Sequence, residues 1–204
     1  MTIVDTVADR YYGGDRTKLA FAFAELLNQE ARALEADGID IVQFDEPAFN
    51  VYMADAADWG VAALERAADG LRCKTAVHIC YGYGIEANNK WKGTLGGEWR
   101  QYEQVFPALR SSAIDQVSLE CMHSHVPLDL IGLLEGKDVM VGVIDVASDA
   151  VETPDEIAET IGRALQFVAR ERLIACTNCG MAPMRRSVAQ AKLQALARGA
   201  ALAA

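Results

Sequence analysis

His78 and Cys80 are the residues of this sequence whose side chains are best suited to bind a metal ion together. They end the stretch Lys74–Cys80, whose apolar and β-branched residues predict a short buried strand before a Tyr-Gly-Tyr-Gly segment. Side chains two residues apart on a strand point to the same face, so an imidazole and a thiol would stand side by side. The alternative interpretation is a core histidine beside a buried cysteine.

Ionisable or metal-binding groups also stand at the carboxyl ends of the other predicted strands. These groups are Asp45 and Glu46, Glu120 and Cys121, Asp145, and Cys176 with Cys179. In parallel α/β proteins, functional side chains gather at this edge of the sheet. His78, Cys80, Glu120 and Cys179 would make a four-ligand set that is typical of tetrahedral zinc. Such a site suits the binding of an incoming thiol as a thiolate, because a coordinated thiol loses its proton.

The other cysteines are predicted to be structural. Cys176 is out of phase with Cys179 and is expected to pack outward, while Cys121 is expected to face away from Glu120. Cys73 precedes its strand, at the end opposite to the predicted site. A redox pair formed by Cys176 and Cys179 is the alternative, although such pairs stand at a helix start in a different fold.

Further residues near the strand ends could bind substrate or carry protons. Asp45 could hold an ammonium group through a charge-assisted hydrogen bond, or it could be a structural carboxylate. His123 and His125 could each carry a proton near pH 7, or could be solvated loop histidines. Asp145 is another candidate for proton transfer. The peptide bond before Pro47 could be cis and so aim the end of its strand.

The bulk composition narrows the class of protein. The chain has 204 residues, of which 51% are apolar, and this predicts a single domain with a substantial core. A net charge of −10 argues against nucleic acid or an anionic membrane surface as a partner. No apolar run approaches the roughly 18 residues of a membrane span. Five cysteines without the spacing of a secreted scaffold indicate the reducing cytoplasm.

Hydrophobic periodicity and turn residues predict alternating helices and strands. Helices are expected at 16–36, 55–70, 98–112, 126–135, 154–170 and 184–203. Strands are expected at 39–44, 74–80, 115–121, 139–146 and 173–177. A glycine-rich loop of about fifteen residues is expected after Cys80, with Gly82, Gly84, Gly93, Gly96 and Gly97, and loops of this length are usually functional or mobile.

This alternation requires a parallel sheet and fits a (β/α)8 barrel of the TIM type. Five strands cannot close such a barrel, so either the sheet is open or the first three βα units are missing. The second is expected, with about five βα units present. The opening Met1-Thr-Ile-Val-Asp5 reads as the tail of a strand. An incomplete barrel would expose a sheet edge, which predicts self-association or a partner chain that completes the barrel.

Four motifs together resemble the C-terminal catalytic barrel of the cobalamin-independent methionine synthases. They are Asp45-Glu46-Pro47-Ala48, His78 with Cys80, Ser118-Leu119-Glu120, and Asn178-Cys179-Gly180. Their order and spacing agree over nearly the whole chain, and the likeness is greatest to the short, single-barrel members. The resemblance implies zinc held by His78, Cys80, Glu120 and Cys179, and contact of Asp45 with the amino group of homocysteine.

The resemblance also implies transfer of a methyl group from a methyl-tetrahydrofolate to the zinc-bound homocysteine thiolate, which forms methionine. Some single-barrel members resemble enzymes that use methylcobalamin. Ala147 stands where the family has its proton-donating histidine, and His123 where it has an arginine, so Asp145 and His123 remain candidates. The alternatives are a non-catalytic, partner-dependent zinc-binding domain and a corrinoid-linked thiol methyltransferase.

Overall fold

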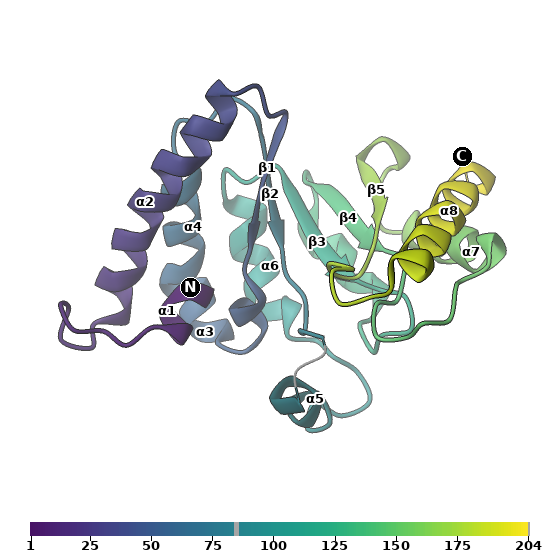
Figure 1. The fold of residues 1–204 in the computed structure, drawn as a ribbon, viewed down its shortest axis with the longest axis horizontal. Coiled ribbons are helices and arrows are strands. Elements are labelled where there is room, and N and C mark those ends of the chain that lie inside the picture. Colours follow the sequence, from purple (N-terminus) through teal and green to yellow (C-terminus); the bar gives the residue numbers. More distant parts are fainter. Residues whose placement is uncertain (84–85, 204) are drawn as a thin grey trace. The chain divides into compact units, whose positions relative to one another are not determined.

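The computed structural model describes residues 1–83 and 86–203 and has the predicted α/β fold, with parallel strands and flanking helices (Figure 1). The chain divides into two compact units. The first comprises Met1–Ile79 and Gln101–Val117, and the second comprises Cys80–Arg100 and Ser118–Ala204. Among the described residues, no helix is long and apolar enough to cross a membrane.

The first unit is built on the strands β1 (Ile41–Asp45) and β2 (Lys74–His78). They pair in parallel, with Asp45 in register with His78. The first residues of β3 (Gln116–Glu120) pair in parallel with β2. The helices of this unit are α1 (Thr2–Thr6), α2 (Arg16–Ala36), α3 (Met53–Asp55), α4 (Val61–Ala68) and α6 (Tyr102–Ser111). A 3-10 helix at Pro47–Asn50 precedes α3, and a π-helical segment at Ala56–Gly60 joins α3 to α4.

Helix α2 has the boundaries that its sequence predicts. The side chain of Asp15 accepts a hydrogen bond from the backbone N–H of Lys18 at 3.0 Å, which caps the first turn. Gly38, with a φ of +94°, lets the chain leave the helix in the left-handed region. Figure 1 shows α2 running alongside α4. Small residues on α2 make this close packing possible, and Ala20 belongs to a buried cluster with Val4 and Ala63.

The second unit holds the last residues of β3, together with β4 (Asp138–Gly142) and β5 (Leu173–Cys176). β4 and β5 pair in parallel. The helices are α5 (Glu86–Lys92), α7 (Pro154–Ala164) and α8 (Arg186–Leu202), with 3-10 helices at Leu128–Leu134 and Arg170–Arg172. α7 and α8 lie side by side (Figure 1). Gly199 allows this approach, because a Cβ atom there would come within 2.5 Å of the Cβ of Ile157.

Several predicted boundaries are wrong. β2 ends at His78 rather than Cys80, because the carbonyl of Ile79 accepts a hydrogen bond from the Tyr102 hydroxyl at 2.9 Å. The alternation of strand faces therefore does not extend to Cys80. β4 ends at Gly142, so Asp145 stands in the loop beyond the strand.

The predictions for the N-terminus and for the glycine-rich loop also need correction. Residues 2–6 form helix α1 rather than the tail of a strand, and Glu46 holds this helix by accepting hydrogen bonds from Met1 and Thr2. The predicted loop after Cys80 contains helix α5. Gly84, one of its predicted glycines, lies outside the described residues. The peptide bond before Pro47 is trans.

Candidate metal centre

Two thiols form the centre of the site in the second unit. Cys80 lies just beyond β2 and Cys179 lies in the turn after β5, 99 residues further along the chain, yet their sulfur atoms are 3.5 Å apart. The pKa of the Cys80 thiol is raised far above its usual value, first by its hydrogen bond with Cys179 and then by burial. Without a metal, the Cys80 thiol therefore stays protonated. A dication would reverse this preference, because a coordinated thiol is deprotonated.

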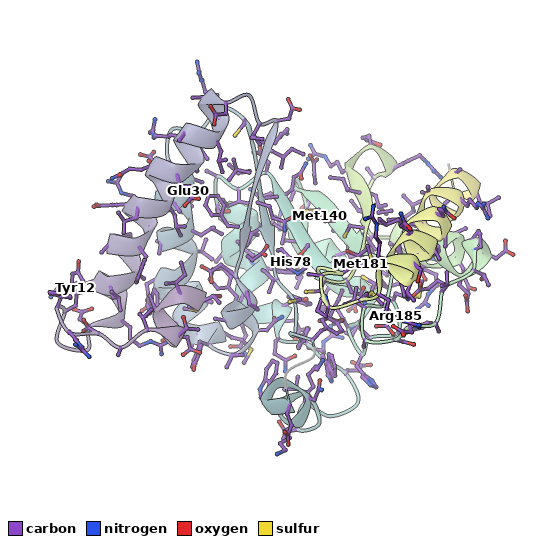
Figure 2. All side chains as sticks on the ribbon, viewed as in Figure 1. Tyr12, Glu30, His78, Met140, Met181 and Arg185 are labelled. Carbon is purple, nitrogen blue, oxygen red and sulfur yellow. The ribbon has the colours of Figure 1, made fainter. Side chains whose placement is uncertain are left out.

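His78 is joined to this pair by the chain itself. It is the last residue of β2 and is almost buried, and only Ile79 separates it from Cys80 (Figure 2). His78, Cys80 and Cys179 together offer one imidazole nitrogen and two sulfur atoms, a group that could hold a metal ion. These are the soft and intermediate donors that zinc prefers.

Glu120 is the last residue of β3, and only 1% of its surface is exposed. One of its carboxylate oxygens accepts a hydrogen bond from the backbone N–H of Tyr81 at 2.8 Å, and the other accepts one from the Tyr83 hydroxyl. Burial raises the pKa of this carboxyl. Its charge in turn contributes to the raised pKa of Cys80, so Glu120 lies within electrostatic reach of the thiols.

Asn178 connects the loop that follows β3 to the loop that follows β5. Its Oδ1 atom accepts hydrogen bonds from the backbone N–H groups of Cys121 and Met122 at 3.2 and 3.4 Å, and its Nδ2 atom donates to the Met122 carbonyl at 2.8 Å. These bonds fix Glu120 and Cys179 through their chain neighbours. Sequence reasoning gave Asn178 no role, although a polar residue directly before a candidate ligand is a usable signal.

A segment with several aromatic residues follows the first thiol in the chain. The ring of Tyr81, which follows Cys80, lies 5.7 Å from the ring of Trp91 and 4.8 Å from that of Trp99. The ammonium group of Lys92 lies 4.5 Å from the centre of the Tyr83 ring and donates to the Gly82 carbonyl at 2.8 Å. Tyr81, Gly82 and Tyr83, which directly follow Cys80, are therefore held by ring contacts and a hydrogen bond. The sequence analysis missed Tyr83 because its partner Glu120 is distant in sequence. It missed Lys92 because its contact with the Tyr83 ring depends on how the segment between them folds.

The predicted proton carriers differ in their surroundings. The Nδ1 atom of His123 lies 3.7 Å from the carboxylate of Asp145, and the His123 backbone has the unusual φ of +51°. Asp145 also accepts a hydrogen bond from the backbone N–H of Ala147 at 2.8 Å. His125 instead contacts the Gly97 carbonyl at 3.2 Å and packs near Trp99, which fits a structural role.

Asp45 ends β1 in the first unit and is exposed. Its carboxylate accepts a hydrogen bond from the side chain of Gln43 at 2.9 Å. The neighbouring Glu46 is already occupied by the N-terminal amine of Met1, at 2.7 Å. Of these two adjacent carboxylates, Asp45 is therefore the one that remains accessible to a charged ligand.

The remaining cysteines of the second unit also have raised pKa values, but burial is the first cause for them, whereas contact with another thiol is the first cause for Cys80. Burial raises the pKa of Cys121 well above its usual value and raises that of Cys176 to about 12. Thiols with such values carry almost no thiolate near neutral pH and react slowly. Cys179, the other half of the predicted redox pair, has its sulfur against Cys80.

Several known proteins that are similar to this chain carry related descriptions. The family model described as the catalytic domain of cobalamin-independent synthase matches residues 1–202. A methionine synthase from Saccharolobus islandicus is 31% identical over 200 residues, which cover 97% of this chain and 54% of that protein. A methionine synthase from Thermococcus kodakarensis is 28% identical over 199 residues, which cover 97% and 53% respectively. The chain thus spans about half the length of these curated relatives.

Solved structures agree with the sequence matches. A B12-independent methionine synthase from Shewanella sp. W3-18-1, solved in complex with selenomethionine, has a TM-score of 0.95 and 58% identity, covering 99% of this chain and 59% of that one. A putative vitamin-B12 independent methionine synthase from Listeria monocytogenes has a TM-score of 0.65 at 16% identity, covering 94% and 57%, and supports the fold alone. These descriptions exclude cobalamin, so they do not support the prediction of methylcobalamin as methyl donor.

Proposed function

This chain belongs to the cobalamin-independent methionine synthase family, and on that premise we propose that it carries the zinc-dependent methyl-transfer centre of such an enzyme. In the proposed reaction, a methyl group moves from the nitrogen of a 5-methyltetrahydrofolate-type donor to the sulfur of homocysteine, and methionine is formed. The whole reaction is a proposal for this chain, which spans about half of its curated relatives.

The contact between Cys80 and Cys179 carries this proposal. Two thiols 99 residues apart in sequence and 3.5 Å apart in space, with a buried carboxylate within electrostatic reach, suit a thiophilic dication. We propose His78, Cys80, Glu120 and Cys179 as its ligands, with zinc as the metal. Bound there, zinc would stabilise the thiolate form of homocysteine as the nucleophile.

The other residues of the proposed site would orient the substrate and manage its protons. Asp45, exposed at the end of β1, would accept a charge-assisted hydrogen bond from the ammonium group of homocysteine. His123 is the candidate proton carrier, because the carboxylate of Asp145 lies 3.7 Å from its ring and would stabilise the imidazolium form. In this proposal neither residue contacts the reacting sulfur, which the metal would bind.

Metal analysis tests the ligand set. We expect about one zinc per chain for a tetrahedral four-ligand site, and loss of the metal on Cys80→Ala or Cys179→Ala. Cys73→Ala is the matched control and should retain the metal, because Cys73 lies in the first unit and is half-buried before β2. Full zinc occupancy in either ligand variant would overturn the assignment of that ligand.

A methyl-transfer assay tests the reaction. Homocysteine and 5-methyltetrahydrofolate are supplied to this chain and to any longer form that its gene encodes, and methionine is measured. Asp45→Asn should raise the KM for homocysteine about tenfold or more with intact metal content, because a hydrogen bond to a charged group is lost. Zinc binding without methyl transfer in either form would favour the alternative of a non-catalytic zinc-binding domain.

A further inference from the structure

Tyr83 holds the carboxylate that the proposed zinc site needs. Its hydroxyl donates a hydrogen bond to Oε2 of Glu120, while the backbone N–H of Tyr81 occupies Oε1 at 2.8 Å. A carboxylate has about four lone-pair positions, so it can keep both hydrogen bonds and still offer an electron pair to a metal ion. The two donors fix the plane of the carboxylate, which a flexible glutamate side chain would otherwise not hold.

Lys92 contacts the face of the Tyr83 ring. Its ammonium group lies 4.5 Å from the ring centre and is anchored by a 2.8 Å hydrogen bond to the carbonyl of Gly82. A cation over the face of a phenol ring withdraws electron density and makes the hydroxyl a stronger hydrogen-bond donor. Lys92, Tyr83 and Glu120 are thus joined by two successive contacts, and the charge of Glu120 acts in turn on the Cys80 thiol.

We propose that Tyr83, supported by Lys92, is a positioning residue that orients Glu120 and thereby raises the affinity of this site for zinc. This inference rests on the proposed metal site and deepens it. Neither residue needs to contact the metal or the substrate, since both act through Glu120. Partners of this kind typically change metal affinity by about 10- to 100-fold.

The first experiment measures zinc affinity by competition with a chromophoric chelator. Tyr83→Phe keeps the ring and removes only the hydroxyl, and should weaken zinc binding by about 10- to 100-fold. Lys92→Met should weaken it by about two- to fivefold, which corresponds to a cation–π contact of about 0.5–1 kcal/mol. Lys92→Arg should restore most of the affinity, because a guanidinium group also stacks on an aromatic ring.

Lys90→Met is the matched control for the loss of a positive charge on α5. Lys90 is largely exposed and pairs with Glu86, four residues earlier on the same helix, at 2.7 Å. Its replacement should leave zinc affinity unchanged. In the Tyr83→Phe background, Lys92→Met should add little further loss, because the hydroxyl through which Lys92 acts is absent.

The absorption spectrum of bound Co²⁺ distinguishes a positioning role from a purely structural one, because only a change at the metal ligands would alter it. In Tyr83→Phe the d–d absorption bands of bound Co²⁺ should shift as the carboxylate becomes less ordered, while the thiolate charge-transfer bands remain. Unchanged or tighter zinc binding by Tyr83→Phe, beside an intact parent site, overturns this inference and leaves the proposed function standing. A parent chain that binds no zinc overturns both.

Discussion

The second unit contains two buried glutamates that differ in the charge of the groups donating hydrogen bonds to them. Glu152 faces Lys192, whose fully buried ammonium group lies 2.9 Å from both carboxylate oxygens and also donates to the Ala150 carbonyl. Glu120 is equally buried, but the two groups that donate to it, the Tyr81 N–H and the Tyr83 hydroxyl, are neutral.

The difference separates a structural carboxylate from one that is suited to a cation. Glu152 has its counter-ion in place and also accepts a hydrogen bond from the backbone N–H of Asp145 at 2.8 Å, so it ties the loop after β4 to α8. Glu120 is buried without such a contact, and burial raises the pKa of its carboxyl. Burial alone therefore does not single out a ligand, whereas burial beside thiols and neutral donors supports the role proposed for Glu120.

Removal of Lys192 should have the largest effect on stability. Lys192→Met leaves Glu152 buried without its counter-ion, and breaking such a pair typically costs about 3–5 kcal/mol. Urea unfolding followed by circular dichroism measures the change. The double variant Lys192→Met/Glu152→Gln should recover much of the loss, because no charge is then left buried. A loss below about 1 kcal/mol in the single variant would show that Glu152 does not depend on its partner's charge.

The same neutral substitution at the two glutamates tests the comparison directly. Glu152→Gln strands the buried ammonium of Lys192 and should cost about 3–5 kcal/mol. Glu120→Gln removes a charge whose hydrogen-bond donors are both neutral and keeps an acceptor for Tyr81, so it should cost less than about 1 kcal/mol in the metal-free protein. Both are measured by urea unfolding in the presence of a chelator. Equal losses in the two variants would contradict the distinction.

The sequence predicted local elements of the fold better than the contacts that join distant segments. Helix α2 was placed correctly because Asp15, Gly38 and the apolar spacing are local signals. The end of β2 was misplaced because the Ile79 carbonyl bonds to Tyr102, a residue distant in sequence. Helix α5 was missed because a short segment rich in polar residues has little periodicity to detect.

The candidate site shows the same division. Residues near strand ends, such as Glu120 and Cys179, could be proposed from the sequence because the chemistry of a candidate ligand depends on a single side chain at a predictable place. The role proposed for Tyr83 could not be predicted from the sequence. Its hydroxyl donates to Glu120, which lies 37 residues further along the chain, and no local pattern links the two residues. The contrast between Glu120 and Glu152 likewise depends on Lys192, which sequence periodicity assigns only to the last helix.

The pH dependence of stability should distinguish the glutamates further. The pKa of Glu120 is higher in the folded chain than the ordinary carboxyl value of about 4.3. Between these two values the folded state binds more protons than the unfolded state, so metal-free stability decreases as the pH rises through this window. Glu120→Gln should remove this decrease, and so should saturating zinc. A parent and variant with the same dependence between pH 4 and 7 would contradict the assignment.

The smallest effect is expected at the start of α7, one residue beyond Glu152. Thr153 caps this helix: its hydroxyl accepts from the Glu156 N–H at 3.3 Å, and its own N–H donates to the Glu156 carboxylate at 2.7 Å. Thr153→Ala removes the hydroxyl cap but leaves the Lys192–Glu152 pair in place, and should cost about 1 kcal/mol in urea unfolding.

This variant is the matched control for Lys192→Met, because both changes disturb the same loop and helix. If the stability of this region depends on the paired charge, the cap should cost only a fraction of what the loss of Lys192 costs. Similar losses in both variants would mean that Lys192 stabilises the region by packing rather than by its charge. The charge of the partner would then not explain the difference between Glu152 and Glu120.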